Sequence, residues 1–473
     1  MDVHRTIVAF LMIASPALAQ TTSDPFPDPI FPRAETYPVV AVGFREFATV
    51  PDSDGDAPRM MGLVDEPATR RLFINDMTGP IYSVSYDGGT VTPYLDIDDP
   101  RWGMDVQSSG RERGFQSFAF HPQFGQRGAP GYGKVYTWVD VSDTSPAADF
   151  TPTGEGDSHD TVLLEWSAAD ASAATYDGAR PRVLFRVQQP YANHNAGHLA
   201  FDPTAEPGDA DYGLLYIGNA DGGSGGDPQN MAQNPASVFG KILRIDPLGT
   251  NAPNGQYGIP ADNPFTTGAP PGTRPEIWAL GLRNPQRFGW DPANGNMYVA
   301  DIGQNTVEEL SPVTAGANLG WNVWEGSFRF VGRNGVDTSD PRADHSIVFP
   351  IAEYDHSDPV LSGRSAATGV VVYRGTELAG LNGRILFGDM PSGEIFHVSA
   401  DNPPGGGDDA IRRVLFRVGD ETRSLLQLIQ EKNRDQGREP ASRTDLRFGQ
   451  AADGRVFILN KHDGTVRLLT AER

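Results

Sequence analysis

Apolar and polar positions alternate in six similar segments along the chain. In each segment, a strand rich in β-branched or aromatic residues leads into a turn rich in Gly, Asp or Asn, and often into a second strand. The segments are 70–85, 133–140, 213–223, 295–310, 383–398 and 454–469. They recur roughly every 60–90 residues, which is longer than a standard propeller repeat and indicates loop insertions.

This recurrence favours an all-β fold, a six-bladed β-propeller with four strands per blade, because radial closure protects the sheet edges. A sandwich of unrelated hairpins is the alternative. We expect segment 43–50 to complete the last blade and segment 421–436 to form a short helix. The prediction is one domain over residues 43–473, preceded by a proline-rich leader at 20–42.

The first nineteen residues are typical of a signal peptide. His4 and Arg5 precede the apolar run 7–14, and small residues lead to a cleavage site after Ala19. A buried N-terminal strand is the alternative. No later segment is apolar enough to span a membrane. We therefore expect a protein with no membrane span that is periplasmic or secreted.

The composition narrows the possible partners. The formal net charge of −23 argues against nucleic acid and anionic membrane surfaces as partners, and it is compatible with bound calcium. The sequence contains no cysteine, so it has no disulfide, no thiolate zinc site and no covalently attached haem.

Polar motifs lie next to the repeated strands, where the loops of a propeller build a ligand site at one end of its channel. They are "RGFQSFAFHPQF" (113–124), "HNAGHLAFDP" (194–203), "IGNADGGSGGDPQN" (217–230), "FGKILRIDP" (239–247), "ALGLRNPQRFGWDP" (279–292), "DIGQNTVEEL" (301–310) and "NLGWNVWEG" (318–326).

Some of these motifs also have simpler readings. His194 and His198 are spaced like a zinc pair, but a loop entering a strand does not give the geometry that this spacing has on a helix; a structural role for both is the other alternative. The loop 222–227 lacks the Lys–Ser/Thr of a phosphate loop. Trp321 and Trp324 are expected to pack between blades rather than to stack on a sugar.

Taken together and in this order, the motifs resemble the soluble glucose/sorbosone dehydrogenase family, from about Arg71 to Leu469. The similarity is greatest to the branch shared with Hedgehog-interacting-protein-like ectodomains. The resemblance implies a six-bladed propeller. It also implies an exported quinoprotein that oxidises an aldose or related sugar, using pyrroloquinoline quinone (PQQ) and Ca2+ and passing electrons to an external acceptor.

The resemblance assigns three catalytic roles. His194 occupies the position of the general base that removes the proton of the anomeric hydroxyl. Asp221 matches the aspartate that orients this histidine. Arg283 matches the arginine over the reacting quinone oxygen, where negative charge develops. His198 is expected to cap or pack at the start of its strand.

The same resemblance implies the cofactor contacts. Asn284 and Arg283 match quinone-binding residues, and Glu112 stands where the family has an amide or acid that contacts the quinone. Gly303 and Gln304 match the pair whose backbone carbonyls hold calcium.

The chain departs from the family pattern at the cationic contacts. Pro391 and Ser392 stand where the family has a lysine, and Arg443 and Arg447 are displaced from the family's arginine pair. Arg364 is a candidate to compensate, because PQQ carries three carboxylates. These departures favour the alternative of a cofactor-free propeller that binds carbohydrate or protein. A calcium-dependent lactonase is a further alternative, but its carboxylate and amide ligands do not assemble from these motifs.

The signal-peptide prediction has a direct test. The exported protein is expected to begin at or near Gln20, as measured by N-terminal sequencing or intact mass. Exported material that retains Met1 or Asp2 would contradict it.

Overall fold

The computed structural model describes residues 21–22, 24–27, 30, 39–53, 55–142, 145–152, 159–332, 335–361 and 363–472. The predicted signal peptide and much of the predicted leader lie outside these described residues. Within the described part of the chain, no helix is long and apolar enough to cross a membrane.

Most strands belong to four-stranded antiparallel units that follow one another along the chain. The first two units contain β3 (Met60–Glu66), β4 (Arg71–Asp76), β5 (Pro80–Ser85) and β6 (Val91–Asp96), then β7 (Phe115–Phe120), β8 (Lys134–Val141), β9 (Asp160–Ser167) and β10 (Arg182–Gln188). The next two contain β11 (Ala196–Phe201), β12 (Leu215–Asn219), β13 (Lys241–Ile245) and β14 (Ile277–Leu280), then β15 (Pro285–Trp290), β16 (Met297–Asp301), β17 (Val307–Val313) and β21 (Ala352–Asp355). Two further units contain β22 (Ala367–Tyr373), β23 (Arg384–Asp389), β24 (Ile395–Ser399) and β25 (Arg412–Val418), then β27 (Arg447–Gln450), β28 (Val456–Leu459), β29 (Thr465–Thr470) and β2 (Val40–Thr49).

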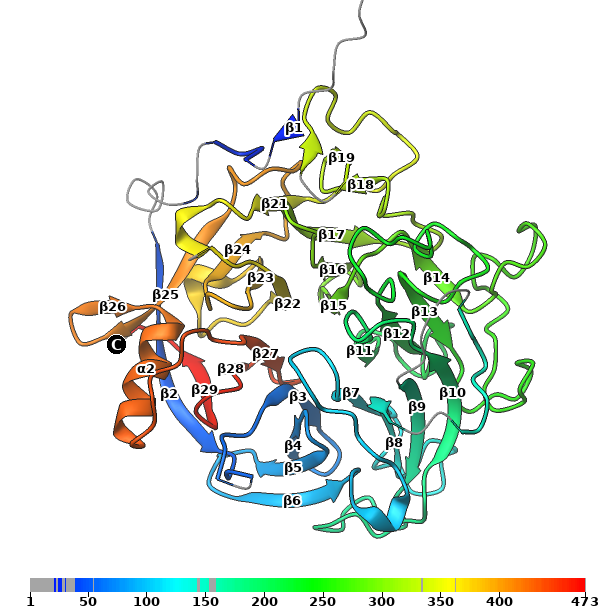
Figure 1. Ribbon diagram of the computed structural model, residues 1–473. Coiled ribbons are helices and arrows are strands. Elements are labelled where there is room, and N and C mark those ends of the chain that lie inside the picture. The colour runs from blue at the N-terminus through cyan, green and yellow to red at the C-terminus, as the bar shows by residue number, and fades with distance from the viewer. Residues whose placement is uncertain are drawn as a thin grey trace, which may run out of the picture.

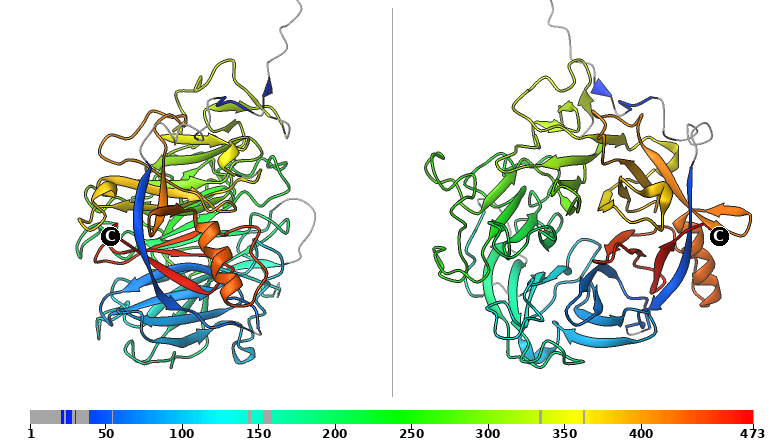
Figure 2. Two further views of the ribbon diagram at one scale, coloured as in Figure 1. Left: turned by 90° about the vertical axis from the view of Figure 1, so that its left-hand side faces the viewer. Right: turned by 180° about the vertical axis from the view of Figure 1, so that it is seen from behind.

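The first strands of the units form a closed ring of contacts around the centre of the molecule. Strand β3 contacts β7, β7 contacts β11, β11 contacts β15, β15 contacts β22, β22 contacts β27, and β27 returns to β3. The views from the front and from behind show the units arranged around this centre (Figures 1 and 2). The fold is therefore mostly β and of the propeller type.

The N-terminal strand β2 joins the two ends of the ring. It pairs antiparallel with β29, from Gly43 opposite Thr470 to Thr49 opposite Thr465. It also pairs in parallel with β25, and β27 pairs in parallel with β3, so these three units form one thirteen-stranded sheet that includes β26 (Glu421–Arg423). The prediction that segment 43–50 completes the last unit is confirmed.

The apolar core lies between neighbouring units. Trp102 and Trp166 pack where the β3 and β7 units meet, and Trp138 packs with Leu243 between the β7 and β11 units. Alternation along each strand presents one set of side chains to each neighbour, so every unit buries both of its faces. This is why the strand segments recur in the sequence.

Smaller elements decorate the ring. Strands β1 (Thr21–Thr22), β20 (Val336–Asp337), β19 (Phe328–Phe330) and β18 (Trp324–Glu325) form a peripheral sheet. Three short 3-10 turns cover Pro100–Trp102, Pro359–Leu361 and Ala379–Leu381. Helix α2 (Leu425–Asp435) begins with a capping box at Ser424, which confirms the helix predicted at 421–436.

Closure by β2 is open to a stability test. Phe47 of β2 is 5% exposed, and its ring lies 4.9 Å from that of Phe457. Phe47→Ala should lower the free energy of unfolding by about 3–5 kcal/mol, because it leaves a cavity in the core. Val418→Ala, at an exposed position of β25, should change it by less than about 0.5 kcal/mol. Equal effects in denaturant unfolding would show that β2 does not carry the closure.

Candidate functional site

The predicted site residues gather at one end of the ring because of strand direction. In an antiparallel unit, the start of the first strand and the end of the second lie at the same edge. The loops entering the first strands and the turns after the second strands therefore share one face of the molecule. This face carries Glu112 before β7, His194 before β11, Arg283 and Asn284 before β15, Asp221 after β12, and Gly303 and Gln304 after β16.

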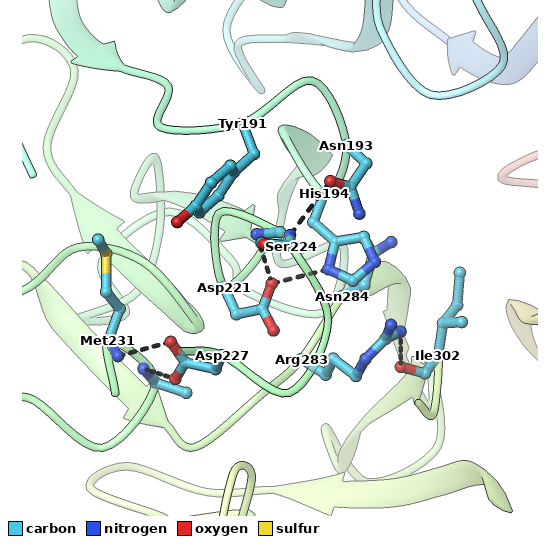
Figure 3. Close-up of polar contacts among 12 residues, drawn as sticks. Tyr191, Asn193, His194, Asp221, Ser224, Asp227, Met231, Arg283, Asn284 and Ile302 are labelled. Atoms are coloured by element: carbon cyan, nitrogen blue, oxygen red, sulfur yellow. Dashed lines mark hydrogen bonds and ion pairs between the residues drawn. The ribbon is translucent and has the colours of Figure 1, made fainter. Parts of the chain in front are cut away.

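His194 and Asp221 form a buried hydrogen-bonded pair. The Nδ1 atom of His194 lies 2.7 Å from Oδ1 of Asp221, and the two residues are 6% and 2% exposed. Figure 3 shows the imidazole turned toward the carboxylate. The backbone of His194 has a φ of +55°, which is uncommon for a residue with a side chain.

Asp221 connects several parts of the site. Its Oδ1 also accepts the N–H of Gly223 at 2.9 Å, and its Oδ2 accepts the indole N–H of Trp321 at 2.9 Å. Burial acts to raise the pKa of Asp221, but the charge and hydrogen bond of His194 and the charge of Arg283 hold it below its usual value. Asp221 is therefore a carboxylate, and it fixes the imidazole with Nδ1–H toward itself and Nε2 free.

Trp321 was not among the predicted site residues. It packs against Phe330 at 4.9 Å, in line with the expected packing role, but its hydrogen bond to Asp221 also places it in the site. Trp324 packs against Phe349 at 5.1 Å. The motif "NLGWNVWEG" drew attention to both tryptophans, but it gave no reason to pair one of them with Asp221.

Arg283 and Asn284 are positioned by a buried carboxylate. Asp301, at the end of β16, accepts the backbone N–H of Arg283 at 2.8 Å and that of Asn284 at 2.6 Å. The guanidinium of Arg283 donates to the carbonyl of Ile302 at 2.9 Å (Figure 3). It also donates to Oε1 of Gln304 at 3.3 Å. Its backbone carbonyl accepts the N–H of Asp221 at 2.8 Å, so the two motifs are directly joined.

The turn that carries Gly303 and Gln304 folds around another buried carboxylate. Oε1 of Glu325 accepts four consecutive backbone N–H groups, those of residues 304–307, at 2.8–3.0 Å. A Cβ atom at Gly303 would lie 1.6 Å from the carbonyl oxygen of Val307, so only glycine fits there. Glu325 belongs to the peripheral sheet; it lies in the motif at 318–326, but it was not among the predicted site residues.

The glycine-rich loop 222–227 serves the site as a frame. The N–H of Gly226 donates to Oε1 of Gln304 at 2.7 Å, and the N–H of Ser224 donates to Oδ1 of Asn193 at 3.2 Å. The loop therefore ties the turn after β12 to the turn after β16.

Glu112 and His198 contribute in different ways. Glu112 is exposed, and its Oε2 accepts the backbone N–H of His194 at 2.9 Å, so it holds the histidine loop. His198 lies within β11, where its Nδ1 is 3.1 Å from Oγ of Ser117 and its ring packs on Phe288 at 4.9 Å. Burial, and secondarily the charge of Arg287, lowers the pKa of His198 well below its usual value. His198 therefore packs, as expected.

Cations line the same face at positions outside the family motifs. Arg443 contacts Asp445 at 2.5 Å, and the Nε atoms of Arg443 and Arg447 are buried without a hydrogen-bond partner. Lys461, in the turn after β28, donates to the carbonyl of Arg111 at 3.2 Å. Burial, followed by the charge of Arg447, lowers the pKa of Lys461 well below its usual value. Lys461 was not among the predicted site residues.

The structure also describes the turn at Pro391 and Ser392, where the family has a lysine, and the candidate compensating residue Arg364. Ser392 donates to Asp389 at 2.6 Å, and Pro391 accepts the N–H of Thr444 at 2.9 Å, so this turn presents no cation. Arg364 is exposed in the loop before β22. In the described parts of the chain, no group of three or more Asp, Glu or His side chains is arranged to hold a metal ion.

The chain is similar to a known protein family and to several known proteins. The sequence model of the family "Glucose / Sorbosone dehydrogenase" matches residues 60–427. The HIPL1 protein of Arabidopsis thaliana is 29% identical over 400 residues, which cover 76% of this chain and 55% of that protein. Human Hedgehog-interacting protein is 30% identical over 231 residues, covering 47% of this chain and 29% of that protein. The chain thus spans about half the length, or less, of these curated relatives.

A solved structure shares the fold. The PQQ-bound form of aldose sugar dehydrogenase from Streptomyces coelicolor superposes with a TM-score of 0.56 at 20% identity, covering 90% of this chain and 97% of that one.

The role of Trp321 in holding Asp221 can be measured. Trp321→Phe keeps the ring but removes the donor to a buried carboxylate, so the free energy of unfolding should fall by about 1.5–3 kcal/mol. Trp324→Phe is the matched control, because that indole packs on Phe349 and does not contact Asp221. The measurement is urea unfolding of both variants. An equal loss of unfolding free energy in the two would show that the Trp321–Asp221 hydrogen bond does not add to stability.

Proposed function

We propose that this chain, which belongs to the glucose/sorbosone dehydrogenase family, is a quinoprotein that oxidises an aldose or related sugar at its anomeric hydroxyl. The observation that carries the proposal is the buried His194–Asp221 pair beside Arg283 and Asn284 at one end of the ring. PQQ-bound relatives with the same fold support the choice of cofactor class.

His194 is the proposed general base. Asp221 holds the Nδ1–H at 2.7 Å, so Nε2 is the nitrogen left to accept the proton of the anomeric hydroxyl. The carboxylate also stabilises the imidazolium that forms when the proton arrives. Removal of this proton and of a hydride from the anomeric carbon converts the sugar to its lactone.

Arg283 is the proposed stabiliser of developing negative charge. Its guanidinium is held by the carbonyl of Ile302 and by Gln304, so it need not reorganise during the reaction. Asn284 follows it on the same Asp301-anchored turn and is proposed as a contact to the cofactor.

The residues present fit the carboxylates of PQQ. Arg443 and Arg447 carry buried Nε atoms without partners, and Lys461 lies on the same face. Together these three cations are proposed to replace the family's lysine, which is absent at Pro391 and Ser392. Glu112 is proposed as a further contact to the cofactor, at the edge of the site.

The turn at Gly303 and Gln304 fits a hard cation. Four N–H groups of residues 304–307 point to Glu325, and the proposed ligands are the backbone carbonyl oxygens of Gly303 and Gln304. When bound, PQQ supplies the acceptor for the hydride, and Ca2+ on these carbonyls acts on the quinone as a Lewis acid.

The architecture proposed for the family applies to the whole described ring. We propose that the units beginning with β3, β7, β11, β15, β22 and β27 are the blades of a six-bladed propeller whose last blade is completed by β2. We further propose that the protein is exported to the periplasm or beyond, and that it passes electrons to an external acceptor.

A cofactor-free binding propeller is the second candidate. It is favoured by the turn at Pro391 and Ser392, which lacks a cation, and by the similarity to Hedgehog-interacting protein. PQQ binding to the purified protein separates the two candidates.

The catalytic assignment predicts different effects at the two histidines. His194→Ala should lower turnover of the best sugar by about 10²-fold or more, with little change in PQQ affinity, because the base contacts substrate. His198→Ala should act through stability, by about 1 kcal/mol. Turnover and PQQ dissociation are measured on reconstituted protein. Equally small effects would make His194 structural, and no PQQ binding by the unaltered protein would favour the binding propeller.

A further inference from the structure

Two buried arginines converge in the centre of the ring. Arg287, the third residue of β15, donates from Nη2 to the carbonyl of Met61 at 2.6 Å and to that of Gln116 at 3.4 Å. Met61 lies on β3, which stands opposite β15 in the ring of first strands, so the side chain of Arg287 crosses the central axis. Arg447, the first residue of β27, directs Nη2 to Sδ of the same Met61 at 3.9 Å.

These two side chains have no carboxylate partner among the described residues. Arg287 and Arg447 are 6% and 2% exposed, and neither forms an ion pair there. Their remaining bonds go to carbonyls, from Arg287 to Gln286 at 2.5 Å and from Arg447 to Leu446 at 2.8 Å. The buried Nε of Arg447 makes no hydrogen bond.

The surroundings hold further positive charge, on Arg443 and Lys461, and one negative charge, on Asp445. Burial, and then the charge of Arg447, lowers the pKa of Arg287 well below its usual value. Burial lowers the pKa of both Arg447 and Lys461, and the charge of Arg443 lowers them further. The charge of Arg447 also lowers the pKa of Lys461. Asp445 is the acidic group that faces these three residues. Asp445 is already engaged by Arg443 and by His462, the latter at 2.9 Å.

Such an arrangement is costly unless a negative charge completes it. An unpaired buried charge usually loses or gains a proton instead of remaining charged, but a guanidinium keeps its proton in proteins. Two guanidinium groups near one another in a buried site therefore require an anion, or the folded state is destabilised.

We propose that a small monovalent inorganic anion, of which chloride is the model, binds at the centre of the ring between Arg287 and Arg447. Most N–H groups of Arg287 already point to carbonyls, so few donors are left. This suits a single compact charge better than a phosphate or sulfate, which needs many donors. The site goes beyond the proposed function, because the anion is proposed to bind the protein that holds no quinone, although Arg447 is also a proposed contact of PQQ.

The test uses the full chain without quinone. Its Tm is measured at fixed ionic strength while sodium isethionate, whose anion is bulky, is replaced by sodium chloride. Chloride that binds only the folded protein should raise Tm saturably, by about 3 °C at a hundredfold excess over its Kd. The rise should disappear in Arg287→Met and in Arg447→Met. It should persist in Arg127→Met, which removes an arginine whose side chain is 77% exposed.

The outcomes are separable. A Tm that follows ionic strength but not the identity of the anion would overturn the proposal, and so would a chloride effect that survives in both Arg287→Met and Arg447→Met. If those variants do not fold, bromide is soaked into crystals of the unaltered protein. Anomalous density between the two guanidinium groups would then support the site, and its absence would overturn it. Since no quinone is present, failure of PQQ binding does not affect the result.

Discussion

The pairing of β2 with β29 is the constraint on which the ring depends. Each unit buries its apolar faces only against its neighbours, so an open ring would expose one face at each end. The pairing from Gly43 to Thr49 ties the beginning of the described domain to its end and removes both exposed faces. The loops of separate units can then be held at fixed distances, and His194, Asp221 and Arg283 come together from segments far apart in the chain.

Buried carboxylates organise the site by collecting backbone N–H groups. Asp301 holds the turn at Arg283 and Asn284, and Glu325 holds residues 304–307. Asp221 holds Gly223, the imidazole and the indole of Trp321. Burial raises the pKa of Asp301 to about 7 although it accepts two backbone N–H groups, whereas the charge and hydrogen bond of His194 hold the pKa of Asp221 below its usual value despite burial. The geometry around the proposed base is thus set by the protein itself, without disulfides.

The sequence predicted those parts of the structure that depend on short patterns. Alternation located the strands of the repeated segments, and the expected helix at 421–436 and completing strand at 43–50 are both present. Motif order placed His194 and Asp221 in one site, and their hydrogen bond joins them, while their catalytic roles are still predictions. The partners that depend on the path of long loops were not predictable. Trp321, Glu325 and Lys461 lie in loops or in the peripheral sheet, and alternation tells which face a residue takes but not which distant group it meets.

The contact between Glu325 and residues 304–307 links an accessory insertion to the centre of the molecule. Strands β18, β19 and β20 of the peripheral sheet lie in the segment between β17 and β21, outside the ring (Figure 1). Although this insertion lies at the periphery, its Glu325 accepts the backbone N–H groups of the turn at residues 304–307. The turn and the insertion therefore form one inheritable module. A chimera that exchanges blades between relatives therefore has to transfer residues 301–307 together with the insertion that contains Glu325. If only one of the two is transferred, the N–H groups of the turn or the carboxylate of Glu325 lose their hydrogen-bond partner.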